Sequence, residues 1–306
     1  MKTISLARIL ILICAFSILT ACSEDEPVDT PLRAPASGSV NYTNRTDHPV
    51  YKRHKDAPLK ILAIGNSFTN NATALMPWFA NRLNGDSICV AKLVRDGSSL
   101  SMHWSSHSGN SHVYDFYYSD KDQWIETDID TFDEALTILD WDIIVLQQVS
   151  YLAGDYDSFQ PYLQFMLRLF NELNPDIKTA WNYPWAYKPG TDHKGFGNYG
   201  NDPEKMYEAI ISAGDRAAVY VDCTIPSATL IKRMREDYPE VEDGFSTDGV
   251  HISSGFASYA LSSLWYECLV TPRLGTTSLN PPIYPQGVTS ELTERADKII
   301  RDLTTR

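Results

Sequence analysis

The strongest constraint on the fold of this chain is an apolar run near residue 60 that ends abruptly in a polar turn. Residues 59–65 are Leu-Lys-Ile-Leu-Ala-Ile-Gly, and Asn66 and Ser67 follow at once. A nearly continuous apolar run is typical of a strand that is buried on both faces, as in a parallel sheet. The turn delivers the hydroxyl of Ser67 to the carboxyl edge of that sheet, where open α/β sheets bind ligands. Ser67 is therefore a candidate nucleophile, although Gly-Asn-Ser is also ordinary turn chemistry.

A second short block, near the C-terminus, supplies what a serine needs in order to react. Asp248 and His251 lie three residues apart in the sequence Asp-Gly-Val-His. A neutral imidazole can accept the proton of a serine, and a carboxylate can hold the imidazole in the required tautomer. An isolated Asp-x-x-His is common at protein surfaces and helix caps, so its meaning comes from its combination with the strand that ends at Ser67.

Together the two blocks resemble those of the SGNH hydrolase (GDSL-like esterase) superfamily. The resemblance implies that Ser67 is the nucleophile, His251 the general base and Asp248 the residue that orients it. One position differs from many members of that superfamily, since Asn66 stands where they carry Asp.

The resemblance also implies an oxyanion hole with three donors. The first is the backbone of Ser67, and the second is Gly97, which follows the second expected strand. The third should be an amide side chain after the third strand, but Gln147-Gln148 replaces the Gly-x-Asn-Asp block of the superfamily. A glutamine carboxamide carries the same two N–H donors as asparagine, so Gln147 or Gln148 is expected to supply this donor.

The rest of the chain alternates between strand and helix patterns. Further strands are expected at residues 87–94, 141–146, 177–185 and 217–223, and helices at 73–83, 158–173, 203–213, 228–236, 254–269 and 290–303. Strands separated by helices favour a parallel sheet covered on both faces. We therefore predict an α/β domain over residues 58–306, a three-layer α/β/α sandwich with a five-stranded parallel sheet in the flavodoxin-like SGNH arrangement.

The N-terminus has the layout of a secretory signal, with basic residues before an apolar stretch at residues 9–19. Leu-Thr-Ala-Cys at its end resembles a lipobox, which implies cleavage after residue 21 and lipidation of Cys22. The acidic residues 24–26 resemble the surface-export signal of Bacteroidota-type lipoproteins. Residues 22–57 are polar and rich in proline, so we expect a flexible tether. The predicted location is the outer membrane or cell surface, with the membrane bound through the lipid on Cys22.

Net charge bears on the binding partners, and the cysteine count bears on disulfide bonds. The formal net charge is −13 and no basic cluster is present, so nucleic acid is not expected to bind. Cys89, Cys223 and Cys268 remain after the signal and Cys22 are set aside. Three cysteines cannot all pair in disulfides, so a complete disulfide framework is excluded, although a single disulfide between two of them is still allowed. No cofactor is expected.

Two insertions are expected to shape the binding site. Residues 103–130 are rich in aromatic residues, which suit either sugar rings or ordinary packing, and residues 187–202 form a Gly/Asn/Pro loop. Candidate substrate contacts are Asn66, Trp104 and Trp185. The three histidines of the first insertion have no carboxylate or cysteine spaced with them, so a metal is not expected.

Two classes of function follow. The first is a serine esterase that removes an acyl group, with acetyl favoured, from extracellular carbohydrate. The second is a non-catalytic glycan-binding surface lipoprotein on the same frame, which the missing Asn block favours. A lipase or thioesterase is a weaker alternative, since no contiguous apolar lid is visible. The sequence leaves the sugar, the acyl group and the oligomeric state open.

Overall fold

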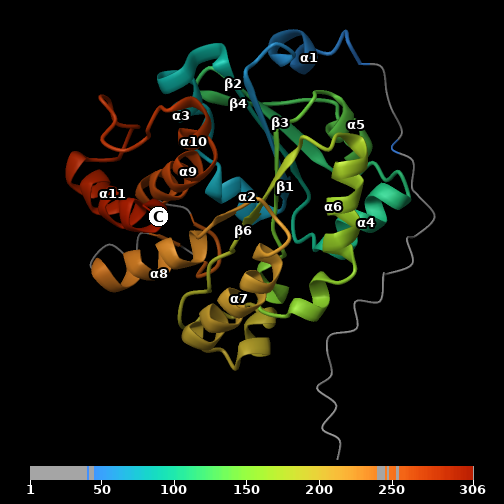
Figure 1. Cartoon of the computed structure of the whole chain (residues 1–306). Coiled ribbons are helices and arrows are strands. Elements are labelled where there is room, and N and C mark those ends of the chain that lie inside the picture. The colour runs from blue at the N-terminus through green and yellow to red at the C-terminus, as the bar shows by residue number, and fades with distance from the viewer. Residues whose placement is uncertain (1–39, 41–44, 240–244, 247, 253–254, 306) are drawn as a thin grey trace, which may run out of the picture. The chain divides into compact units, whose positions relative to one another are not determined.

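A seven-stranded sheet of order β4-β3-β2-β1-β5-β6-β7 forms the centre of the fold (Figure 1). The computed structural model describes residues 40, 45–239, 245–246, 248–252 and 255–305. The strands are β1 (Leu59–Gly65), β2 (Ile88–Val94), β3 (Asp115–Asp120), β4 (Gln123–Glu126), β5 (Ile143–Leu146), β6 (Lys178–Asn182) and β7 (Cys223–Ile225). Every residue of β2 and β5 is buried, as continuous apolar strands at the centre of a covered sheet should be.

The sheet is mixed, so the prediction of a five-stranded parallel sheet is wrong. Strands β2, β1, β5, β6 and β7 are parallel, but the hairpin β3–β4 adds two antiparallel strands beside β2. The hairpin lies inside the insertion at residues 103–130. Phe116 and Tyr118, two residues apart on one face of β3, are both buried, and Lys121 takes the positive φ of 53° that the tight turn needs. Much of this aromatic content therefore extends the sheet.

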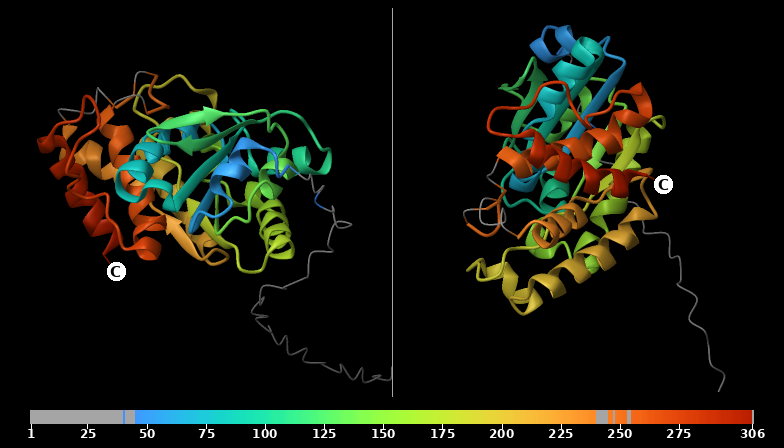
Figure 2. Two further views of the ribbon diagram at one scale, coloured as in Figure 1. Left: turned by 90° about the horizontal axis from the view of Figure 1, so that it is seen from above. Right: turned by 90° about the vertical axis from the view of Figure 1, so that its left-hand side faces the viewer.

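Helices cover both faces of the sheet, which confirms the α/β class (Figures 1 and 2). On one side α9 packs against α2, α3, α8, α10 and α11, and on the other α4 packs against α5 and α6. The helices are α1 (Pro49–His54), α2 (Ser67–Ala72), α3 (Met76–Asn84), α4 (Leu100–Ser108), α5 (Phe132–Thr137), α6 (Tyr162–Leu173), α7 (Pro203–Ala218), α8 (Ser227–Asp237), α9 (Gly255–Leu269), α10 (Thr271–Leu274) and α11 (Ser290–Thr304).

The last strand lies further along the chain than predicted. A strand was expected at residues 217–223, but α7 continues to Ala218 and β7 begins only at Cys223. Ala213 and Ala217 continue the buried face of α7 at a spacing of four residues, while Val219 and Tyr220 are exposed. The helical period of the buried residues therefore prevails over the local β-branched composition.

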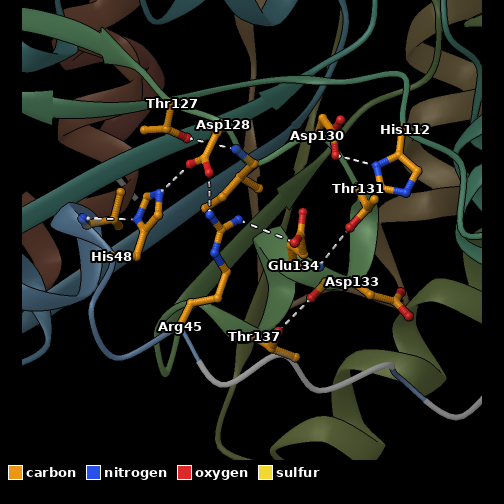
Figure 3. A network of polar contacts seen from close by, with 12 residues as sticks. Arg45, His48, His112, Thr127, Asp128, Asp130, Thr131, Asp133, Glu134 and Thr137 are labelled. Atoms are coloured by element: carbon orange, nitrogen blue, oxygen red, sulfur yellow. Dashed lines mark hydrogen bonds and ion pairs between the residues drawn. The ribbon is translucent and has the colours of Figure 1, made fainter.

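Residues before β1 are already part of the folded domain. The Arg45 guanidinium contacts the carboxylates of Asp128 at 2.7 Å and Glu134 at 3.3 Å (Figure 3). His48 caps α1 by accepting from the N–H of Val50, and its Nε2 lies 3.0 Å from Asp128. Because Val50 is fully buried, the folded part begins by residue 45, earlier than the predicted boundary at residue 58.

The predicted signal at residues 1–21, Cys22 and most of the predicted tether lie outside the described residues. In the part that the structure describes, no helix is long and apolar enough to cross a membrane. Among the described residues, Cys89, Cys223 and Cys268 form no disulfide with one another, and Cys89 is buried.

Candidate active site

Ser67 lies where the sequence predicts, at the junction of β1 and α2. Asn66 is the N-cap of α2, and its side chain accepts from the N–H of Phe68 at 3.1 Å. Ser67 is the first residue of the helix, so its own N–H has no partner within the helix. The strand must end in glycine, because a Cβ on Gly65 would lie 2.0 Å from Thr69 Oγ1.

The structure brings Ser67, His251 and Asp248 together. Ser67 Oγ lies 2.9 Å from His251 Nε2, and His251 Nδ1 lies 2.6 Å from Asp248 Oδ2. The three side chains come from two segments of the chain, because Ser67 and His251 are 184 residues apart whereas Asp248 and His251 are three residues apart. In this geometry a carboxylate can orient an imidazole, and the imidazole can accept the proton of a hydroxyl.

The carboxylate is held in its ionised form. Asp248 Oδ1 accepts from the N–H groups of Val250 at 2.8 Å and His251 at 2.7 Å, and from Ser246 Oγ at 3.2 Å. Partial burial opposes ionisation, but the hydrogen bonds from His251 and Val250 outweigh it and hold the pKa of the Asp248 carboxyl well below its usual range.

Trp185 contacts the residues next to Ser67 and His251. Its side chain is fully buried, its Nε1 donates to the carbonyl of Val250 at 2.9 Å, and its ring stacks on Phe68 at 4.1 Å between centroids. It therefore links the residue after Ser67 to the residue before His251. The prediction that Trp185 contacts substrate does not agree with this burial.

Trp104, the other predicted aromatic contact, belongs to a different part of the fold. It lies on α4 and packs against His107 and Phe165, and it is not among the residues that line the pocket over Ser67. His103 and His107 are buried next to it. Among the described residues, no group of three or more His, Cys, Asp and Glu side chains could hold a metal ion.

A pocket of about 220 Å³ opens over Ser67. Its lining is Asn66, Ser67, Phe68, Asp96, Gly97, Val149, Ser150, Tyr151, His193, Val250 and His251. Gly97 has φ of 66°, a left-handed conformation that favours glycine, and lies in the loop that follows β2. The structure thus brings Gly97 and Ser67 to one cavity, as predicted from their positions after neighbouring strands.

The two glutamines lie elsewhere. Gln147 is buried; its Nε2 donates to Asn66 Oδ1 at 2.9 Å and its Oε1 accepts from Asn182 at 2.8 Å. Asn66 in turn donates to the carbonyl of Ser98 at 3.0 Å, so Gln147 helps to fix the turn before Ser67.

Both polar atoms of the Gln148 side chain form two hydrogen bonds within the protein. Its Oε1 accepts from the N–H groups of Leu100 and Val149, and its Nε2 donates to the carbonyl and the hydroxyl of Ser158. Neither glutamine lines the pocket. The geometry therefore does not favour the prediction that one of them donates to an oxyanion.

Several pocket residues were not singled out from the sequence. Ser150 belongs to the same short segment as the two glutamines, and Asp96 immediately precedes Gly97, so the strand-end rule that selected their neighbours could have found them. Tyr151 and His193 both line the pocket, and their ring centroids lie 6.0 Å apart. His193 lies in the Gly/Asn/Pro loop, and nothing in its local sequence marks it.

Comparison with protein families places the chain. The family described as a domain of unknown function (DUF4886) matches residues 60–300, which include Ser67, Gly97, Asp248 and His251. The chain belongs to the DUF4886 family. No curated protein matches it.

Solved structures agree with the family assignment. A DUF4886 family protein from Bacteroides uniformis is 27% identical with a TM-score of 0.72, and the match covers 81% of this chain and 95% of that one. Two further solved structures are less similar. A protein named as an SGNH hydrolase from Slackia heliotrinireducens is 19% identical with a TM-score of 0.48, and the match covers 70% of this chain and 99% of that one. An acetylxylan esterase from Geobacillus stearothermophilus is 11% identical with a TM-score of 0.42, covering 70% and 94%.

Proposed function

We propose that this DUF4886 protein is a serine esterase of the SGNH type. The single observation that carries the proposal is the continuous hydrogen-bonded relay from Ser67 through His251 to Asp248, in which Ser67 and His251 line a pocket. Buried structural serines rarely need a base that is oriented by an ionised carboxylate, whereas acyl transfer requires both.

In the proposed reaction, Ser67 Oγ attacks the carbonyl carbon of the ester and its proton passes to His251 Nε2. The tetrahedral oxyanion accepts from the N–H groups of Ser67 and Gly97. When the intermediate collapses, His251 gives the proton to the leaving alkoxide, which departs as the alcohol. A water molecule, deprotonated by His251, then attacks the acyl-serine; the acid leaves and Ser67 recovers its proton.

The features of the pocket support a small acyl group on a polar alcohol. Val149 and Val250 are buried aliphatic residues in the lining of this cavity of about 220 Å³, and we place a small acyl group such as acetyl beside them. Asp96, Tyr151 and His193 offer acceptors and ring faces at the rim, which suit the hydroxyls and C–H faces of a sugar. We therefore propose O-acetylated carbohydrate as the substrate class. Lipidation at Cys22 would hold the enzyme at the outer membrane or cell surface, where such glycans are met.

The test is hydrolysis of 4-nitrophenyl acetate, and acetate release from acetylated glycans, by the chain from residue 23 onward. We expect Ser67→Ala to lower kcat/KM by several orders of magnitude, whereas the matched control Ser105→Ala, on the exposed face of α4, keeps the parental value. If the parent and Ser67→Ala are equally inert while both bind glycans, the chain is a binding protein and the proposal fails.

A further inference from the structure

The segment after β5 presents a hydroxyl to the pocket where the sequence led us to expect an amide. Both carboxamides of this segment are engaged inside the protein, and the N–H of Val149 is taken by Gln148 Oε1 at 2.9 Å. Ser150 comes next, at the start of the 3-10 helix η2 (Ser150–Leu152), and it lines the pocket together with Ser67 and Gly97. Its hydroxyl is the first side-chain donor that this segment offers to the cavity.

A buried phenol lies behind Ser150. The Tyr187 hydroxyl is 2.7 Å from Ser150 Oγ, and the Tyr187 side chain is fully buried against the rings of Phe68, His193 and Phe196. Burial raises the pKa of Tyr187 to about 12, so the phenol keeps its proton at every pH at which an esterase operates.

This pair has one favourable arrangement of protons. Within the described part of the chain, the Tyr187 hydroxyl forms its hydrogen bond with Ser150 Oγ. If Ser150 donated to Tyr187, the phenol proton would be buried without an acceptor, at a cost of about 1–3 kcal/mol. Tyr187 therefore donates and Ser150 Oγ accepts. The proton of Ser150 is then directed away from Tyr187, and the hydrogen bond that its oxygen accepts makes it a stronger donor.

Sheet topology brings this hydroxyl to the same place as the two backbone donors. Strands β2, β1 and β5 are adjacent and parallel, so their carboxyl ends meet at one edge. Gly97 follows β2, Ser67 follows β1 and Ser150 follows β5, and all three residues line one pocket. An oxygen that accepts from the N–H groups of Ser67 and Gly97 is therefore approached by Ser150 from the β5 side.

We propose that Ser150 donates the third hydrogen bond to the oxyanion and that Tyr187 is the positioning residue that holds its hydroxyl in that orientation. This inference rests on the proposed esterase function. No proton is transferred to or from Ser150; its hydrogen bond to the carbonyl oxygen strengthens as negative charge develops there, so it lowers the barrier more than it tightens substrate binding.

The experiment compares Ser150→Ala, Tyr187→Phe and the double variant with the parent, using steady-state hydrolysis of 4-nitrophenyl acetate and thermal unfolding. Ser150→Ala should reduce kcat by roughly 10²-fold with little change in KM. Tyr187→Phe should reduce kcat by about ten-fold, because Ser150 is still present but is no longer oriented. The matched control is Tyr207→Phe, which removes a similar phenol–hydroxyl contact, 3.1 Å to Thr229, outside the pocket.

The double variant separates catalysis from folding. Ser150→Ala alone leaves the buried Tyr187 phenol without a hydrogen-bond acceptor and should lower Tm. Adding Tyr187→Phe removes this unpaired hydroxyl and should restore part of the Tm. If Ser150 acts on the oxyanion, kcat of the double variant stays as low as that of Ser150→Ala. If kcat recovers with Tm, or if all variants stay within two-fold of the parent, the inference is overturned. In the second case an inactive Ser67→Ala would still leave the esterase proposal standing, whereas an inert parent would overturn both.

Discussion

Replacing Asp248 by asparagine should cost more activity than removing its side chain altogether. In the parent, Oδ1 accepts from two backbone N–H groups and Oδ2 accepts from His251 Nδ1. In Asp248→Asn the amide oxygen must stay on the side of the two backbone donors, so the amide NH₂ faces Nδ1. The imidazole is then forced to carry its proton on Nε2, which faces Ser67 and can no longer accept.

The size of the effect follows from the alternative arrangement. Turning the amide round would restore the correct tautomer, but its NH₂ would then face the two backbone N–H donors. Two or three hydrogen bonds would be lost, at a cost of about 4–6 kcal/mol. That corresponds to roughly 10³–10⁴ in kcat/KM. The Asp248 side chain is 51% exposed, so water absorbs part of the penalty and we expect the lower end of this range.

The assay is kcat/KM for 4-nitrophenyl acetate from pH 6 to 9, with Tm as the check on folding. Asp248→Ala serves as the matched variant: its imidazole can adopt either tautomer and loses only its orientation, so its activity should exceed that of Asp248→Asn. Equal activity of the two variants, or an Asp248→Asn enzyme within ten-fold of the parent, would refute the tautomer argument.

Three further predictions test other parts of the structure. Gln147→Ala should lower Tm and should lower kcat about ten-fold, because the Gln147 side chain supports the turn before the nucleophile. Gln148→Ala should lower Tm alone. A loss of kcat above 10²-fold at unchanged Tm in either variant would instead mark that glutamine as an oxyanion donor. Asp96→Asn should raise the ratio of kcat/KM for anionic 4-acetoxybenzoate to kcat/KM for its neutral methyl ester several-fold, because the Asp96 carboxylate in the pocket lining repels anionic esters. The gain should disappear at high salt, and an unchanged ratio at low salt contradicts this prediction. Burial lowers the pKa of Lys92 to about 8, against roughly 10.4 when unfolded, so its charge opposes folding below pH 8 and stability rises as pH increases toward 10. Lys92→Met should therefore raise Tm at pH 7, and the gain should shrink above pH 8; a lower Tm at pH 7 would show that its contact with the Trp124 ring, 4.3 Å from Nζ, outweighs desolvation.

The parallel core of the fold was predictable because burial on both faces leaves a clear sequence signal. Strands β1 and β2 are continuous apolar runs, and their predicted bounds agree with the structure within one or two residues. The hairpin β3–β4 was missed because its strands are half-exposed and aromatic, a composition that also suits a binding loop. The position of β7 was predicted too early, because the local apolar run at residues 217–223 was given more weight than the helical period of the buried residues in α7.

At the site, the sequence order of strand ends predicted which residues would meet, but not which way their side chains would point. Ser67, Gly97 and His251 were found because a strand end or a spacing rule fixes each position. The orientation of the two glutamines depends on Asn182 and Ser158, partners that no local pattern reveals. The same limit applies to Ser150, whose significance comes from Tyr187, 37 residues away.

The buried position of Trp185 gives the protein an internal optical probe. Its indole joins Phe68, next to the nucleophile, to the carbonyl of Val250, next to the base, so the two halves of the relay cannot separate without changing the surroundings of this ring. A dry, hydrogen-bonded indole emits at short wavelength, and exposure to water would shift that emission to the red. The difference in fluorescence between the parent and Trp185→Phe would therefore follow the loop that carries His251 during acylation, without any attached dye.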